Sequence, residues 1–214
     1  MISFSGIDCS GKSTQIALLC KKMDEMGKPY QVVWSRGGYT PGIDFVKKCL
    51  RRGKKLSKEE RIAYSQKTNE NPKKRRILFL AGLADLLVFY SITLRLRGLR
   101  KTIICDRYIW DTYIDYKMRY PDYQFEKSFL WKLLLKTMVK PTASFCLTIP
   151  AEMSMYRSTL KDEPFPEPVE VREKRIAMYQ AEIANGRWEY VIDATQSIDE
   201  VFDSIMRIVR IGEE

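Results

Sequence analysis

The feature that most constrains this chain is a glycine-rich turn near its N-terminus, with the sequence GIDCSGKST over residues 6–14. The turn matches G-x-x-x-x-G-K-[ST] at every fixed position. The apolar run at residues 2–4 predicts a strand before it, and apolar residues at helical spacing over 15–20 predict a helix after it. Backbone N–H groups and the positive end of the helix dipole then form a cradle for phosphate. The chain is therefore predicted to bind a nucleoside triphosphate.

The same motif predicts a role for individual side chains of the turn. Lys12 is expected to reach the β- and γ-phosphates, and the Ser13 hydroxyl is expected to ligate Mg²⁺. ATP and Mg²⁺ are thus the predicted cofactors. The predicted cofactor-binding residues are Gly6, Asp8, Cys9, Ser10, Gly11, Lys12, Ser13 and Thr14.

Composition limits the class of protein. A chain of 214 residues can bury a proper core, and we expect one domain over residues 1–214. The chain has no histidine, which excludes a histidine-based triad or a histidine-ligated metal. Its five cysteines are scattered and form no C-x-x-C pair, which argues against a disulfide framework or a zinc site. We therefore expect a cytoplasmic protein.

The positive charge is concentrated in one segment. The chain carries a formal charge of +10, and residues 41–76 contain thirteen Lys or Arg against four Asp or Glu. A basic segment of this kind can attract nucleic acid, an anionic membrane or a polyanionic substrate. We favour a solvated helical surface, a basic insertion over about residues 43–76, because no aromatic stacking pattern or nucleic-acid motif accompanies the charge.

Predicted strands and helices alternate along the chain. Strands are expected at residues 30–34, 101–105, 144–149 and 188–192, with helices between them, among them 109–120 and 125–140. This alternation is typical of an α/β fold, here a doubly wound sheet of about five parallel strands with helices on both faces. The proline-rich stretch 161–168 has the size of a small mobile lid, which we place over about residues 157–170.

One apolar stretch allows two interpretations. Residues 77–94 are long and apolar enough for a membrane span, and lysines and arginines flank them. However, Asp85 lies at the centre, and a helix buried against a parallel sheet is also apolar nearly all round. We favour the buried helix, and a membrane-docked protein is the alternative.

The strand at 101–105 delivers two charged residues at its carboxyl end, where ligands bind in open α/β sheets. Asp106 can hold the Mg²⁺ hydration shell or accept a proton, and Arg107 can clamp phosphoryl oxygens. Arg36 follows the second strand in the same way and could hold a second anionic group; a surface arginine on a turn is the alternative.

On the turn, on Asp106-Arg107-Tyr108 and on the closing strand, the chain resembles the thymidylate kinases, a family of nucleoside monophosphate kinases. The resemblance implies that Arg36 contacts the acceptor phosphate and that Arg107 neutralises the transferring phosphoryl group. It implies that Asp8 contacts the acceptor's sugar and that Arg157 and Lys161 supply lid cations. The residues expected to act in catalysis are Lys12, Asp106, Arg107 and Arg157.

The chain departs from the family pattern on the acceptor side. Leu86 stands where the family has an arginine, Asp111 where it has a serine, and Asp115 where it has the tyrosine of a Tyr-Gln pair. Asp8, Arg36, Arg107, Asp111 and Asp115 are the predicted substrate-binding residues. The best prediction is transfer of phosphate from ATP to dTMP, and another phosphorylated or hydroxylated small molecule is the alternative acceptor. A nucleic-acid-associated ATPase is the alternative from another class. We expect small-molecule partners and no nucleic acid, and a homodimer stays open.

Overall fold

The computed structural model describes residues 1–35, 71–160 and 168–209. Arg36, the basic segment as far as residue 70, and residues 161–167 of the predicted lid, including Lys161, lie outside the described residues. The chain divides into two compact units, which are described separately below; the prediction of one domain stays a prediction. The first unit comprises Met1–Arg36, Arg97–Asp122 and Lys140–Glu214, and the second comprises Gly37–Leu96 and Tyr123–Val139.

The first unit is built on a sheet of five parallel strands in the order β2-β3-β1-β4-β5. Phe4 of the central strand lies opposite Asp106 on one side and Phe145 on the other. The predicted number of strands and their parallel direction are both confirmed. The strands are β1 (Ile2–Gly6), β2 (Tyr30–Trp34), β3 (Thr102–Asp106), β4 (Ala143–Thr148) and β5 (Tyr190–Asp193).

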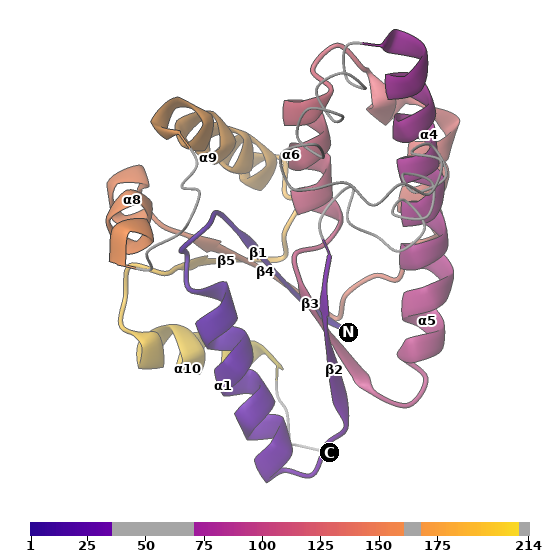
Figure 1. Ribbon diagram of the computed structural model, residues 1–214. Coiled ribbons are helices and arrows are strands. Elements are labelled where there is room, and N and C mark those ends of the chain that lie inside the picture. Colours follow the sequence, from indigo (N-terminus) through magenta and orange to yellow (C-terminus); the bar gives the residue numbers. More distant parts are fainter. Residues whose placement is uncertain (36–70, 161–167, 210–214) are drawn as a thin grey trace, which may run out of the picture. The chain divides into compact units, whose positions relative to one another are not determined.

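Helices cover both faces of this sheet. Figure 1 shows α1 (Lys12–Glu25) and α10 (Ile198–Val209) on one face, and α6 (Ile109–Arg119) and α9 (Val169–Ala184) on the other. A further helix of this unit, α8 (Ala151–Leu160), packs against α9. The predicted doubly wound α/β arrangement is therefore confirmed.

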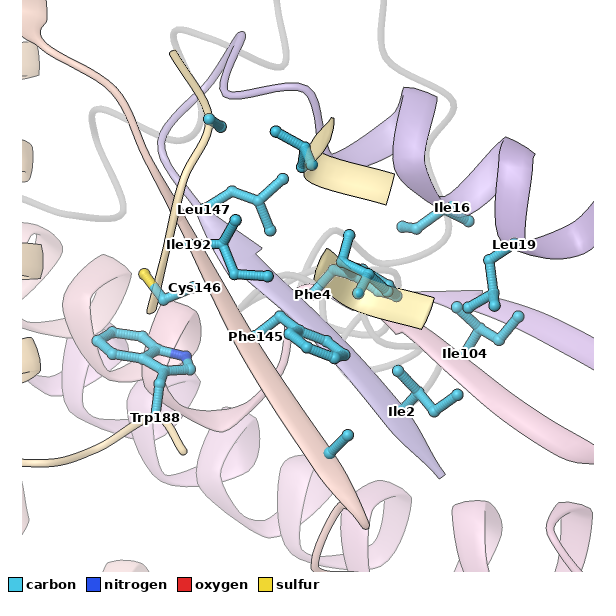
Figure 2. Close-up of a cluster of buried hydrophobic side chains, with 14 of the residues drawn as sticks. Ile2, Phe4, Ile16, Leu19, Ile104, Phe145, Cys146, Leu147, Trp188 and Ile192 are labelled. Atoms are coloured by element: carbon cyan, nitrogen blue, oxygen red, sulfur yellow. The ribbon is translucent and has the colours of Figure 1, made fainter. Parts of the chain in front are cut away.

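The core of the first unit lies on both faces of the central strands. All five residues of β1 are buried, as expected for a strand covered on two sides. On one face the rings of Phe4 and Phe145 stack with centroids 5.3 Å apart, and Ile16 of α1 points toward them (Figure 2). On the other face the ring of Tyr179 stacks on that of Trp188 at 5.6 Å. This stacking packs α9 against the segment that leads into β5.

The described residues of the second unit, 71–96 and 123–139, form helices and connecting turns. Asn71 caps the first helix, since its side chain accepts a hydrogen bond from Lys74 N at 3.1 Å, and Pro72 occupies a favoured first position. The predicted helix of residues 77–94 therefore begins earlier, at residue 72. The elements are α4 (Pro72–Val88), the π-helix η1 (Phe89–Thr93), α5 (Leu94–Arg97), the 3₁₀ turn η2 (Phe125–Lys127) and α7 (Phe129–Thr137).

Among the described residues, the helical stretch Pro72–Arg97 is long and apolar enough to cross a membrane, with a mean hydropathy of 2.1 over its most apolar window. Length and composition alone do not separate a membrane span from a core helix. One face of α4, which includes Phe79 and Leu83, is buried, and α4 packs against α7. Ile77 and Val88 are about half exposed.

The predicted helix 125–140 is wrong in one respect, because Ser128 divides it. Residues before Ser128 form the 3₁₀ turn η2, and the Ser128 side chain then accepts a hydrogen bond from Trp131 N at 3.3 Å. A serine in this role starts a new helix, and α7 begins at residue 129. The apolar residues keep a helical spacing across Ser128, so the sequence pattern alone predicted one continuous helix.

Candidate functional site

The glycine-rich turn has the backbone that its sequence predicts. It connects β1 directly to α1, and Gly11 caps the helix in a left-handed conformation with φ +90°. Gly6 has φ +137°, and a Cβ at this position would overlap the carbonyl oxygen of Leu147 on the neighbouring strand. Because the first N–H groups of a helix have no partner within it, this turn presents donors to an anion.

Lys12 lies inside the turn, with only 6% of its surface exposed. Its Nζ donates to Gly6 O at 2.9 Å, to Ile7 O at 2.7 Å and to Ser10 Oγ at 3.4 Å. Burial, assisted by the nearby Arg107, lowers the pKa of Lys12 from 10.5 to about 8. A phosphate bound at the turn would supply the negative charge that favours the ammonium form.

Arg107 directly follows β3 and is buried beside the turn. Its backbone has φ +72°, its N–H donates to Phe4 O at 2.8 Å, and its guanidinium donates to Gly6 O at 3.2 Å and pairs with Asp8. Burial acts to lower the pKa of Arg107, but Tyr179 and the neighbouring carboxylates raise it above its ordinary value. Two cations, Arg107 and Lys12, therefore share the Gly6 carbonyl at the end of β1.

Asp106 supplies a buried carboxylate oxygen beside the turn. Its Oδ1 is buried and, within the described parts of the chain, accepts no hydrogen bond. Burial raises the pKa of Asp106, and Lys12 and Arg107 act against this shift. An orphaned carboxylate oxygen and the exposed hydroxyl of Ser13 are ligands of the type that Mg²⁺ prefers, so these residues fit the ion. No cluster of three or more Cys, Asp or Glu suited to a metal occurs among the described residues.

Asp111 is a buried residue of α6 that binds groups from β1 and α9. Only 1% of its surface is exposed. Its Oδ2 accepts from Ser5 Oγ at 2.5 Å and from Tyr108 N at 3.0 Å, and its Oδ1 accepts from Tyr179 OH at 2.5 Å. The Oδ1 atom also lies 3.5 Å from Arg107. Both oxygens are thus occupied by groups of the protein, and direct contact of Asp111 with an acceptor stays a prediction that these contacts do not favour.

Asp115 lies one helical turn further along α6 and pairs with Arg175 of α9. Their Oδ1 and NH1 atoms are 2.5 Å apart, and both side chains are mostly buried. On the same helix, Arg172 donates to Ser154 Oγ at 3.2 Å and to Ser158 Oγ at 3.3 Å. These contacts fix α9 to α6 and α8 through charged groups, and a substrate role for Asp115 stays a prediction.

A cavity of about 320 Å³ lies next to the glycine-rich turn. Arg157 of α8 forms part of its wall and donates to Ala194 O at 3.2 Å and to Cys9 O at 3.5 Å. One side of the cavity is the turn and the start of α1, and the other is the loop from β5 to α10. Its lining residues are Cys9, Ser10, Gly11, Thr14, Gln15, Arg157, Leu160, Ala194, Gln196, Ile198 and Val201.

The structure brings most of the predicted site residues together at the carboxyl ends of β1 and β3. The prediction missed Ser5 and Tyr179, which hold Asp111, and Gln15, which lines the cavity. Ser5, the fourth residue of the buried strand β1, was a usable signal, because a buried hydroxyl needs a partner. For Tyr179, the sequence offered no signal beyond its place on a helix.

The fold and the site define a P-loop nucleotide-binding protein of the α/β class. A family model described as thymidylate kinase matches residues 4–205, so the chain belongs to the thymidylate kinase family. The "Probable thymidylate kinase" of Methanocaldococcus jannaschii is 28% identical over 208 residues, covering 96% of this chain and 93% of that protein. The "Thymidylate kinase" of Symbiobacterium thermophilum is 29% identical over 222 residues, covering 97% of this chain and 91% of the other.

Solved structures show the same fold. A deoxyadenosine kinase from M. mycoides with bound dATP superposes with a TM-score of 0.62 at 17% identity, and 98% of each chain is covered. The same enzyme with dCMP and dCDP bound gives 0.61 at 16% identity, again over 98% of each chain. The predicted family and the predicted enzyme class, an ATP-dependent phosphotransferase among the nucleoside monophosphate kinases, are confirmed by the family match.

Proposed function

We propose that this enzyme transfers the γ-phosphoryl group of ATP to a nucleoside monophosphate, with dTMP as the first acceptor to test. The observation that carries the proposal is the pair of buried cations, Lys12 and Arg107, which share the Gly6 carbonyl at the end of β1. Membership of the thymidylate kinase family and the names of the relatives support the choice of acceptor.

Phosphoryl transfer needs positioning and charge neutralisation more than covalent chemistry from the protein. In the proposed mechanism, Lys12 binds the β- and γ-phosphates and Arg107 neutralises charge on the transferring group. Asp8 pairs with Arg107 and thereby orients the guanidinium. Ser13 and Asp106 would hold Mg²⁺, which supplies further neutralisation of the phosphates when bound. Burial of both cations strengthens their effect, because little water screens them.

The 320 Å³ cavity is the proposed site of the ATP base. It begins at Ser10 and Gly11 of the phosphate-binding turn, so a nucleotide whose phosphates lie in the turn can extend into it. Ile198 and Val201 give it apolar surface, and Arg157 offers a planar guanidinium on which a base can stack. We therefore propose that Arg157 binds the base of ATP, and we propose no other part for it in catalysis.

The residues predicted to bind the acceptor follow the family pattern less closely than those of the donor turn. Leu86, Asp111 and Asp115 differ from the family pattern, while the donor turn matches it at every fixed position. Arg36, proposed to contact the acceptor phosphate, lies outside the described residues. We therefore propose dTMP as the first acceptor and another nucleoside monophosphate as the alternative within the same reaction.

The proposal is tested by a coupled ADP-release assay over all nucleoside monophosphates, dTMP first. We expect one monophosphate to stimulate ADP release, and Lys12→Ala to reduce the rate by on the order of 1000-fold, as for removal of one preorganised donor to the transition state. Lys21→Ala, an exposed lysine of the same helix, is the matched control. Near-normal transfer by Lys12→Ala, or release stimulated only by DNA or RNA, would contradict the proposal.

We also propose a cytoplasmic location. The buried free thiols of Cys105 and Cys146, whose pKa values burial raises, are consistent with a reducing compartment. The sequence leaves a homodimer open, and sedimentation equilibrium of the purified chain would measure the oligomeric state.

A further inference from the structure

Arg172 of α9 is a buried guanidinium whose hydrogen-bond partners are neutral. Only 4% of its surface is exposed. Its two terminal nitrogens donate to the hydroxyls of Ser154 and Ser158, at 3.2 Å and 3.3 Å. Within the part of the chain that the structure describes, no carboxylate forms an ion pair with it. A buried charge without a counter-ion costs free energy in the folded protein, so packing alone would favour an apolar side chain of similar length here.

The two serines of α8 differ in what they contact beyond Arg172. Ser154 is fully buried, and its Oγ donates to the carbonyl oxygen of Asp8 at 2.9 Å. Two consecutive hydrogen bonds therefore connect Arg172 to the phosphate-binding turn. Ser158 lies one helical turn further along α8, and among the described residues Ser154 is the one of the two that is bonded to the turn.

The carbonyl that Ser154 binds adjoins a strained residue of the turn. Cys9 has φ +63°, a left-handed backbone that is unfavourable for a residue with a Cβ and persists only where its neighbours hold it. Side chains of α8 bind the carbonyls on both sides, because Arg157 donates to Cys9 O at 3.5 Å. Since the peptide between Asp8 and Cys9 is planar and trans, fixing the Asp8 carbonyl also fixes the direction of the Cys9 N–H. The direction of its N–H groups is what allows such a turn to bind phosphate.

We propose that Ser154 and Arg172 are positioning residues for the phosphate-binding turn. Arg172 holds the hydroxyl of Ser154, this hydroxyl holds the Asp8 carbonyl, and the peptide that follows keeps the orientation that phosphate requires. A hydrogen bond from a charged donor is stronger than a neutral one, and each bond of such a chain polarises the next. Neither residue needs to touch the ligand. The inference rests on the proposed function only in that ATP binds the turn through its phosphates.

The two serines offer a matched pair of variants. Ser154→Ala and Ser158→Ala each remove one hydroxyl that accepts from Arg172. Only the first also removes the bond to Asp8. Calorimetric titration with ATP and Mg²⁺, without any acceptor and well below the Tm of each variant, measures the effect. We expect Ser154→Ala to weaken ATP binding about 10-fold and Ser158→Ala to weaken it by less than about 2-fold.

Inorganic tripolyphosphate, titrated in the same way, reports on the turn alone because it has no base. Its affinity should fall by the same factors as that of ATP. A general loosening of the protein would instead affect the two serine variants alike, since both lose a buried bond to the same guanidinium.

Arg172→Met tests whether the arginine acts through Ser154. We expect this variant to weaken ATP binding about 5-fold by itself. Combined with Ser154→Ala it should add less than about 2-fold, because both changes act on the same carbonyl. A direct effect of the guanidinium charge on the phosphates would be retained in full in the Ser154→Ala background. Lys174→Met removes a charge from an exposed position of the same helix and should keep the wild-type affinity.

Equal losses of affinity in the two serine variants would overturn the inference, as would a loss with ATP that tripolyphosphate does not share. Full additivity of Arg172→Met with Ser154→Ala would overturn the role of the arginine. If Arg172→Met fails to fold, the comparison of the two serine variants decides the question.

These outcomes are distinct from failure of the proposed function, which the assay of phosphate transfer decides. A wild-type protein that binds ATP but phosphorylates no nucleoside monophosphate would remove the proposed function, and the ratios of affinity would still decide the positioning role. A wild-type protein that binds no ATP would overturn both.

Discussion

Gly6→Ala is the substitution that most directly tests the geometry of the phosphate-binding turn. An added Cβ would overlap the backbone oxygen of Leu147 and lie 2.9 Å from Ser10 Oγ, and the residue has φ +137°. The serine hydroxyl can rotate away, but the oxygen belongs to the paired strand β4 and cannot move without disturbing the sheet. The substitution therefore combines backbone strain with a clash that no change of rotamer relieves.

The two costs can be estimated separately. A non-glycine residue in a rare backbone conformation costs about 1–3 kcal/mol. Overpacking against a fixed neighbour costs about 1–3 kcal/mol more. The sum is roughly 4 kcal/mol, which is a large share of the free energy of unfolding of an ordinary domain. For a chain of this size, where 1 kcal/mol shifts Tm by about 2–4 °C, we expect Tm to fall by about 10 °C.

Thermal unfolding followed by circular dichroism measures this effect, with Gly27→Ala as the matched control. Gly27 also has a positive φ, +63°, but a Cβ there meets nothing within 4 Å. Only the left-handed backbone is then penalised, by about 1–2 kcal/mol, and Tm should fall by about 4 °C. If the two variants lose the same stability, the close approach of Gly6 to the strand β4 is refuted as the reason for a glycine at this position.

Further predictions concern Lys12, Asp111 and Tyr179 of the site. Because the pKa of Lys12 falls to about 8 in the folded protein, ATP binding above pH 8 should take up a proton, which calorimetry in buffers of different ionisation enthalpy detects. The lowered pKa also makes charged Lys12 destabilise the folded state. This destabilisation is complete below pH 8 and disappears as the pH rises toward 10.5, so the free energy of unfolding should increase over this range. Asp111→Asn should lower the free energy of unfolding by about 3 kcal/mol in urea titrations, because it leaves buried Arg107 with less compensation. Tyr179→Phe removes the hydroxyl shared by Asp111 and Arg107 and should lower kcat about 10-fold, with little change in the Kd of ATP.

Each of these predictions has an outcome that contradicts it. ATP binding at pH 9 without proton uptake would mean that Lys12 stays charged in the free protein. For Asp111→Asn, the control is Asp199→Asn on an exposed turn of α10, and equal stability of the two variants would count against the buried pair. For Tyr179→Phe, an unchanged kcat would show that Arg107 is held well enough by Asp8 and Gly6 alone.

Local spacing in the sequence determined the main features of the fold. The turn at residues 6–14 has fixed glycines because its backbone needs them, and five short apolar runs separated by helical patterns predicted the parallel sheet correctly. Lys12, Asp106 and Arg107 could be placed at strand ends for the same reason, since the carboxyl end of a strand is a local property of the sequence. The family resemblance came from these same segments.

Only the tertiary structure decided which groups that are distant in the sequence bind one another. Asp111 looked like a ligand for a substrate, but Ser5 from β1 and Tyr179 from α9 both donate to its carboxylate. Gln15 looked like any polar residue of a helix, but its side chain donates to Ile198 O, far along the chain, and so links α1 to α10. A periodic pattern tells which face of an element is buried, because that depends on neighbours in sequence. It does not tell which donor meets which acceptor, because that depends on how helices and strands pack.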